Sequence, residues 1–330
     1  MSDNFKSVNK GRVVGTIVET NYEYKADAKS MFDERIKGGF VKSEFKNPMF
    51  LVRVEEKDDD GNVVSTTNLG VDGFDVYKYF YTKEDERKES SAYKVMEKLL
   101  SSDNHGVGTR VIFSSASLGE NCYYRDGALV QSITVDKGSY IESDVEKTAK
   151  AKDVAVFGLT GVFGDIEQQT DGSLKVDFYF AKKADGTLAE LKGLVVDADV
   201  ADDFLQFFRK DDRAEIQIQA VDVMHGTVEE ESTSKAVFGK KNDNLKRGWM
   251  GTEFKITYAE VIDDLESDKY LDEEVFDKGM ELRKAELKAK KQKAEEKANN
   301  ASSTSSSKGL GQKKEFLDAI PDDEEDNPFA

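Results

Sequence analysis

Two short stretches decide the fold: GTRVI at residues 108–112 and DDRAEI at residues 211–216. Each follows a segment with apolar residues at helical spacing, which predicts a helix that leads into a strand. In the first segment, Lys83–Ser101, the apolar positions are Tyr93, Met96, Leu99 and Leu100. In the second, Asp199–Lys210, they are Val200, Phe204, Leu205, Phe207 and Phe208.

The segments around these helices are rich in Val, Ile, Phe, Tyr and Thr, which favours strands. A strand pair built on a turn precedes each helix, near residues 50–70 and near 174–196. Asp-Gly suits the positive φ values of a type I′ turn, so each such pair predicts an antiparallel hairpin. Such pairs stand at Asp60-Gly61, Asp126-Gly127, Asp171-Gly172 and Asp185-Gly186. The order β-β-β-α-β-β therefore occurs twice.

That order is typical of the OB-fold, a small Greek-key barrel that binds oligonucleotides. We predict a mainly β fold with two OB-fold-like antiparallel β-barrels, a C-terminal helix and a disordered acidic tail. The predicted parts are a first barrel domain at 1–142, a second at 153–263, a helical extension at 264–299, a disordered Ser/Gly-rich linker at 300–314 and an acidic partner-docking tip at 315–330. A different small β-barrel in the second half is the alternative.

The composition limits the class of protein. Cys122 is the only cysteine, so no intramolecular disulfide forms, and His105 and His225 are too few for a metal cluster. We therefore predict no enzyme activity, no metal and no cofactor. The N-terminus lacks an apolar signal region, and no apolar run reaches the ~18 residues of a membrane helix, which predicts a cytoplasmic protein. The net charge is −18, so a surface for nucleic acid must be a local basic patch.

The C-terminal tip carries the most specific signal. A Ser/Gly-rich stretch leads to five acids, Asp322, Asp323, Glu324, Glu325 and Asp326, followed by Pro328 and Phe329. This arrangement resembles the tip of bacterial and phage single-stranded-DNA-binding proteins. The resemblance implies that the acids meet a basic rim on replication, recombination or repair enzymes, while Phe329 fills an apolar pocket. Here Ala330 follows Phe329, which departs from the family pattern of a terminal Phe. A generic solubilising acidic tail is the alternative.

Aromatic residues supply candidate platforms for bases, because every base has a face that stacks. Tyr77 and Tyr79 alternate in VYKYFYTK and would share one face of a strand. Tyr123, Tyr124 and Arg125 precede a predicted hairpin turn. Packing in a barrel core is the alternative for each aromatic residue, and it is the expectation for Phe178 and Phe180.

The stretch Lys235–Met250 is the most basic candidate loop of the body. It holds the cations Lys240, Lys241, Lys246 and Arg247 and the sole tryptophan, Trp249. It falls where an OB-fold carries the loop between its fourth and fifth strands, which often clamps nucleic acid. Two further basic stretches are candidates for contact with DNA, Lys25–Lys46 and Arg283–Lys293. The second of these follows an apolar stripe that predicts docking of the helix on the body, through Leu265, Leu271, Val275, Met280 and Leu287.

These features favour a non-enzymatic protein of DNA replication, recombination or repair, encoded by a phage and active in the host cytoplasm. It would coat single-stranded DNA without sequence specificity and recruit partner enzymes through its tail. The alternative hypothesis is a β-rich scaffold or assembly protein whose acidic tail binds a basic protein partner.

Overall fold

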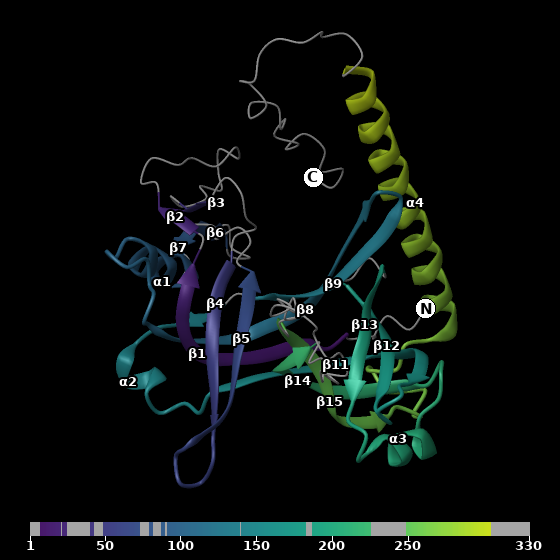
Figure 1. Ribbon diagram of the computed structural model, residues 1–330, viewed down its shortest axis with the longest axis horizontal. Helices are drawn as coiled ribbons and strands as arrows, with labels where there is room; N and C mark the ends of the chain where they lie inside the picture. The colour runs from purple at the N-terminus through teal and green to yellow at the C-terminus, as the bar shows by residue number, and fades with distance from the viewer. Residues whose placement is uncertain are drawn as a thin grey trace, which may run out of the picture.

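The fold is mainly β, with two small barrels side by side and a long C-terminal helix (Figure 1). The computed structural model describes residues 7–20, 22–24, 40–42, 49–72, 79–81, 87–89, 91–138, 140–182, 187–225 and 249–304. The predicted fold class is confirmed in its two OB-like barrels and its C-terminal helix. The predicted domain limits stay predictions.

The first barrel is a closed cycle of five strands. These are β1 (Asn9–Thr20), β4 (Met49–Lys57), β5 (Val63–Asp72), β8 (Arg110–Arg125) and β9 (Ala128–Asp136). β1 pairs with both β4 and β8, β4 pairs with β5, and β8 pairs with β9, all antiparallel. A parallel contact between Asp72 and Asp136 closes the cycle, and α1 (Ser91–Leu100) lies between β5 and β8 in the chain. This is the OB-fold connectivity.

The second barrel repeats this connectivity. Its strands are β11 (Val154–Gln168), β12 (Leu174–Ala181), β13 (Leu188–Val196), β14 (Arg213–His225) and β15 (Trp249–Val261). β11 pairs with β12 and β14, and a parallel contact between Val195 and Lys255 closes the cycle. The helix α3 (Ala201–Phe207) takes the place of α1. In both barrels the alternating inward residues are buried, including Phe50 and Val52 in β4 and Phe178 and Phe180 in β12.

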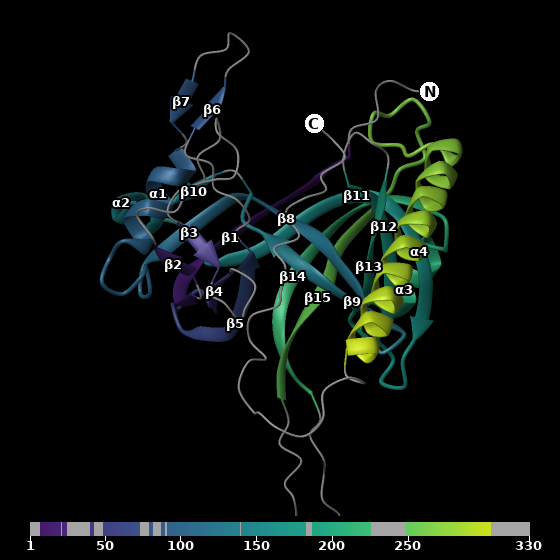
Figure 2. The same ribbon diagram turned by 90° about the horizontal axis from the view of Figure 1, so that it is seen from above.

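Five short strands and two helices complete the described chain. They are β2 (Tyr22–Tyr24) paired with β3 (Phe40–Lys42), β6 (Tyr79–Tyr81) paired with β7 (Arg87–Glu89), β10 (Ile141–Glu142) paired with β8, and the helices α2 (Val145–Thr148) and α4 (Glu273–Thr304). In Figure 2, α4 lies along the outside of the second barrel.

The two barrels are joined through their first strands. β1 and β11 pair antiparallel from Asn9–Leu159 to Val14–Val154, so one sheet runs through both barrels. Because corresponding strands pair antiparallel, the barrels are related by an approximate two-fold rotation. The hairpin β8–β9 therefore reaches onto β13 of the second barrel, and the hairpin β14–β15 reaches onto β5 of the first.

The GTRVI and DDRAEI stretches each contribute an arginine that donates hydrogen bonds to the backbone of the segment following its barrel. Arg110 donates from Nε to the Thr148 carbonyl at 3.0 Å and from Nη2 to the Ala151 carbonyl at 2.7 Å. Arg213 donates from Nε to the Leu271 carbonyl at 3.1 Å. Each arginine thus holds the segment that leaves its own barrel.

Three predicted elements differ in extent. The helix predicted from Lys83 begins only at Ser91, and Arg87–Glu89 form a strand instead, because no apolar residue between Lys83 and Ser91 can dock a helix. α3 is shorter than predicted at both ends. The C-terminal helix begins at Glu273 rather than Asp264 and continues to Thr304, into the predicted linker. Leu265 of the predicted apolar stripe is accordingly 70% exposed.

In each barrel, a glycine of the first strand allows the second strand to approach closely. In β1, Thr16 pairs with both Arg53 of β4 and Arg110 of β8. In β11, Val162 pairs with both Tyr179 of β12 and Arg213 of β14. Each first strand therefore bends where its two neighbouring strands meet. Gly15 and Gly161 directly precede these residues. A Cβ on Gly161 would collide with the Tyr179 carbonyl oxygen, and one on Gly15 would collide with that of Arg53.

We predict that Gly161→Ala lowers the free energy of unfolding by about 1–3 kcal/mol, because the collision is with backbone that cannot move independently. Gly158→Ala in the same strand is the matched control, since its Cβ would meet only the Lys10 carbonyl oxygen at 3.7 Å. Urea unfolding followed by circular dichroism measures both variants. Equal losses in the two variants would contradict this account of the bend.

Candidate nucleic-acid interface

OB-folds bind oligonucleotides across the outer face of their second and third strands and the loops beside it. In this chain that face occurs twice. The first face is the outer side of β4 and β5, and the second face is the outer side of β12 and β13. The surroundings of the two faces differ.

The first face combines apolar, cationic and open positions. Along β4, Phe50, Val52 and Val54 point into the core, so Met49, Leu51 and Arg53 point outward. On β5, Asn68 lies opposite Arg53 and Gly70 lies opposite Leu51. A Cβ on Gly70 would meet only the Met49 sulfur, at 3.7 Å, so space remains above this glycine.

This arrangement suits a single strand. Arg53 is exposed, and its Nε donates to Asn68 Oδ1 at 3.5 Å, which orients the guanidinium along the face. A guanidinium both neutralises phosphate and stacks on a base, and Leu51 beside Gly70 offers an apolar surface for a second base.

The hairpin of the second barrel borders the first face. Asp222 on β14 accepts the backbone N–H of Asn68 at 2.8 Å and the hydroxyl of Thr252 at 2.8 Å. Its own N–H donates to the Thr67 hydroxyl at 3.3 Å. Asp222 therefore ties the hairpin to β5, three residues before the end of β14 at His225. The open end of this hairpin is the pair His225 and Trp249, which flanks residues 226–248 in the sequence.

The second face is covered by the chain itself. α4 begins with an apolar contact, in which Val275, Phe276 and Met280 pack on a buried cluster of Val162, Ala181, Leu188 and Leu271. The ring of Phe276 lies edge-on to that of Tyr179 on β12, with centroids 6.0 Å apart. Tyr179 occupies the position in the second barrel that Arg53 occupies in the first. Arg53 pairs with Thr16, which follows Gly15, and Tyr179 pairs with Val162, which follows Gly161.

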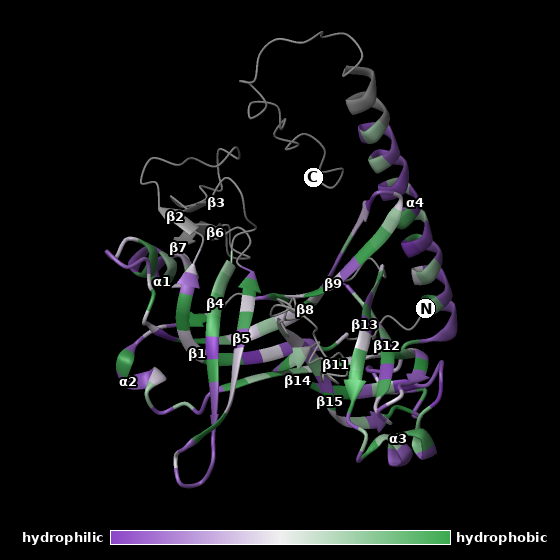
Figure 3. Ribbon diagram, in the orientation of Figure 1, coloured by the Kyte–Doolittle hydropathy of each residue, from purple (hydrophilic) through white to green (hydrophobic). Residues whose placement is uncertain are grey.

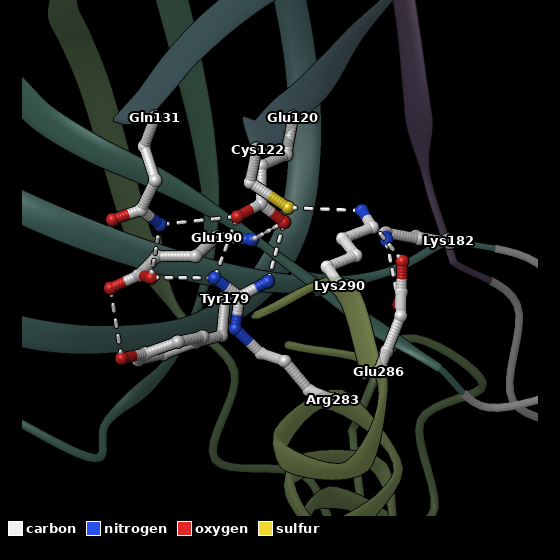
Figure 4. Close-up of polar contacts among 9 residues, drawn as sticks. All are labelled: Glu120, Cys122, Gln131, Tyr179, Lys182, Glu190, Arg283, Glu286 and Lys290. Atoms are coloured by element: carbon white, nitrogen blue, oxygen red, sulfur yellow. Dashed lines mark hydrogen bonds and ion pairs between the residues drawn. The ribbon is translucent and has the colours of Figure 1, made fainter. Parts of the chain in front are cut away.

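A buried ionic cluster fixes α4 in this place (Figure 4). Arg283 is 5% exposed and binds Glu120 of β8, 1% exposed, through both Nη1 and Nη2, the latter at 2.6 Å. Its Nη2 also lies 2.7 Å from Glu190 of β13. Gln131 Nε2 donates to both carboxylates, at 3.1 and 2.9 Å, and the Tyr179 hydroxyl donates to Glu190 at 3.1 Å. The cluster connects both barrels to the helix.

The charges in this cluster are mutually dependent. Burial raises the pKa of Glu120, but hydrogen bonds from Arg283 and Gln131 outweigh it and hold that pKa below its usual value. Burial and then the Glu190 carboxylate raise the pKa of Tyr179, which stays a hydrogen-bond donor. At the end of the contact, Lys290 Nζ lies 2.9 Å from Glu286 and 3.2 Å from the Cys122 sulfur.

Comparison with known proteins found distant structural likeness only. No protein-family model matches the chain, and no curated protein matches it. A crystal structure of the wild-type single-stranded DNA binding protein from Thermus aquaticus has 11% identity and a TM-score of 0.42, covering 78% of this chain and 94% of that one. A deletion mutant of that protein has 10% identity and a TM-score of 0.41, covering 81% and 98%. At these values the likeness carries no conclusion about function.

The structure separates the predicted site residues. Tyr123, 44% exposed, and Tyr124 lie near the tip of β8–β9, beside the second face, with the Arg125 side chain 75% exposed. The turn itself is confirmed, with positive φ at both Asp126 and Gly127. Trp249 begins β15 at the border of the first face, and Tyr79 begins β6, but only their backbones are described. Outside the described residues lie Tyr77, Lys240, Lys241, Lys246, Arg247 and the tip residues Asp322, Asp323, Glu324, Glu325, Asp326, Pro328 and Phe329.

One candidate is corrected and several were missed. Arg283 of the basic stretch Arg283–Lys293 is buried between two carboxylates, so it is not available to DNA. Sequence reasoning missed the outward residues Leu51, Arg53, Asn68 and Gly70. The alternation in MFLVRV, with an arginine among the outward positions, is the signal that identifies Leu51 and Arg53 as residues of this face.

Among the described residues, no three His, Cys, Asp or Glu side chains are grouped so that they could hold a metal ion. Within the same part of the chain, no helix has the length and apolar character needed to cross a membrane.

We predict that Arg283→Ala releases α4 from the second face, because it leaves Glu120 and Glu190 buried without their cation, at a cost of about 3–5 kcal/mol. Lys284→Ala, which changes the exposed neighbour of Arg283, is the control. Hydrogen exchange over residues 276–290 should accelerate in the first variant only. Unchanged protection in Arg283→Ala would show that the apolar contact alone holds the helix.

Proposed function

We propose that this protein coats single-stranded DNA without sequence specificity, as a non-enzymatic, phage-encoded component of replication or recombination in the host cytoplasm. The supporting observation is the first face, on which Arg53 is exposed and the described residues leave space above Gly70, with the hairpin β14–β15 at its border. Because α4 covers the second face, we propose that the first face is the main DNA-binding face, although the chain contains two barrels.

Electrostatics favours the same path. The first face presents Arg53. The sequence between β14 and β15 holds Lys240, Lys241, Lys246 and Arg247, which we propose as phosphate contacts, with Trp249 and Tyr77 or Tyr79 as stacking residues. The second face instead presents Glu190, with Glu120 of β8 beside it, and the two carboxylates would repel phosphate if Arg283 were absent. A local basic patch allows DNA binding by an acidic protein, since screening confines charge effects to about 10 Å.

Stacking and phosphate contact imply preference for single strands. Bases in a duplex do not expose their faces, whereas a flexible strand can lay them on Leu51 or against Arg53. Such contacts read no base edge, so binding depends little on sequence. Tyr123, Tyr124 and Arg125 lie beside the second face, and we propose them as contacts for a strand that continues past the first face.

We predict that Leu51→Ala combined with Arg53→Ala weakens binding of fluorescein-labelled oligo-dT by about tenfold or more, at ~1–3 kcal/mol per lost stacking contact. The slope of log affinity against log salt should fall by about 0.7 for the one cation removed. Fluorescence anisotropy measures both, with a duplex of equal length as the comparison. The control is Tyr123→Ala combined with Arg125→Ala, which should have the smaller effect. The reverse order of effects, or equal affinity for the duplex, would contradict the proposal.

For the acidic tip we propose recruitment of replication or recombination enzymes. Five adjacent acids steer a basic partner surface, and one aromatic anchor can supply much of the contact energy. The residues proposed for this contact are Asp322, Asp323, Glu324, Glu325, Asp326, Pro328 and Phe329.

We predict that Phe329→Ala weakens binding of the full-length chain to purified host replication and recombination enzymes by at least tenfold, because it removes the apolar anchor. Its affinity for oligo-dT should stay within twofold of wild type. Surface plasmon resonance with immobilised enzymes measures the first quantity. Loss of oligo-dT affinity together with retained enzyme binding would assign the tip to DNA rather than to partners.

A further inference from the structure

An apolar pocket lies on the second barrel between α3 and β15. Its volume is about 220 Å³, and its walls include Val196, Val200, Phe207, Ile256 and Tyr258. Phe207 is 69% exposed, Tyr258 47% and Val200 45%, so three large apolar side chains stand open to water here. Hydrophobic and hydrophilic residues lie next to one another on α3 in Figure 3.

The local sequence explains why Phe207 is left outside. Phe204 and Phe208 are four residues apart, and both enter the core, where each ring lies 5.4 Å from that of Phe163. Phe207 therefore projects from another side of the short helix. Leaving a phenylalanine in water forgoes about 1.5–3 kcal/mol of burial. Phe207 is grouped with the exposed Val200 and Tyr258 around the pocket, and such a group of exposed apolar side chains is typical of an interaction site.

The first barrel shows that this exposure is not required by the fold. The corresponding helix, α1, buries Ala92, Tyr93, Met96, Leu99 and Leu100. It also contacts β10, whose Ile141 is 4% exposed. Within the described part of the chain, α1 has no exposed aromatic residue that corresponds to Phe207.

The rim of the pocket is acidic. Asp203 lines the pocket, and the exposed Asp199 and Asp202 are the sequence neighbours of the lining residues Val200 and Asp203. In the residues that the structure describes, none of the three has an ion-pair partner. Nearby cations are engaged elsewhere: Lys255 lies 2.6 Å from Asp197, and Arg209 donates to the carbonyl of Phe208 at 2.7 Å. This rim repels phosphate and attracts cationic groups.

We propose that this pocket docks a cationic segment of a partner protein, which inserts one large apolar side chain between Phe207 and Tyr258 and sets lysines or arginines against the three aspartates. The volume falls below the ~300 Å³ lower range of small-molecule sites and suits a side-chain anchor. The pocket is independent of the DNA path and of the acidic tip, so the proposal goes beyond the proposed function.

The test uses the full-length protein and a fluorescein-labelled, amphipathic 14-residue peptide of lysine, leucine and phenylalanine. The same peptide with glutamate in place of lysine is the charge control. Phe207→Ser should weaken binding of the cationic peptide at least tenfold, measured by anisotropy. The triple change Asp199→Asn, Asp202→Asn and Asp203→Asn should weaken it and reduce its salt dependence. Val145→Ser is the matched control, because Val145 is 78% exposed on the first barrel.

Three outcomes would overturn the proposal. Equal affinity of wild type and Phe207→Ser would mean that the peptide binds the acidic surface at large. Equal binding of both peptides would remove the role of the aspartates. Loss of self-association in Phe207→Ser, seen by sedimentation velocity without any change in peptide binding, would make the pocket a contact between copies of this chain. Unchanged thermal unfolding of each variant ensures that the result reports the surface.

Discussion

The antiparallel ladder between β1 and β11 is the constraint on which the rest of the structure depends. It joins the first strands of two barrels with the same connectivity, and so relates the barrels by an approximate two-fold rotation. That rotation carries each barrel's fourth and fifth strands across to the other barrel's third strand. Each candidate face is therefore completed by the opposite barrel, and neither barrel alone would present the surface found in the whole chain.

The symmetry is broken by α4. On one side, Asp222 ties a hairpin to β5, while Arg53 is exposed and Leu51 and Gly70 are partly exposed. On the other, Arg283 joins Glu120 and Glu190, and Phe276 covers Tyr179. A buried ion pair adds little net stability compared with apolar packing, but it is costly to break on one side only. The cluster thus specifies where the helix docks. As a result, the helix covers the second face, whereas the first face has the same strand arrangement without a docked helix among the described residues.

The repeated strand order, the hairpins at Asp60-Gly61, Asp126-Gly127 and Asp171-Gly172, and the burial of Phe178 and Phe180 followed from the sequence, because local patterns determine them. The fourth predicted turn, Asp185-Gly186, lies outside the described residues. The outward position of Arg53 was in principle available from the alternation in MFLVRV. The role of Arg283 was not, because a basic stretch on a helix looks solvated until distant carboxylates on β8 and β13 are brought to it by the fold. Likewise, nothing in residues 118–136 indicated that their hairpin lies on the other barrel, since pairing of β1 with β11 is a long-range contact.

The most direct test of the central claim is hydrogen exchange of the full-length protein with and without oligo-dT. The account predicts that oligo-dT slows exchange over β4 and β5, at residues 49–57 and 63–72, and leaves β12, β13 and α4 unchanged. Protection over residues 174–196 accompanied by faster exchange in α4 would contradict it, because DNA would then bind the second face by displacing the helix.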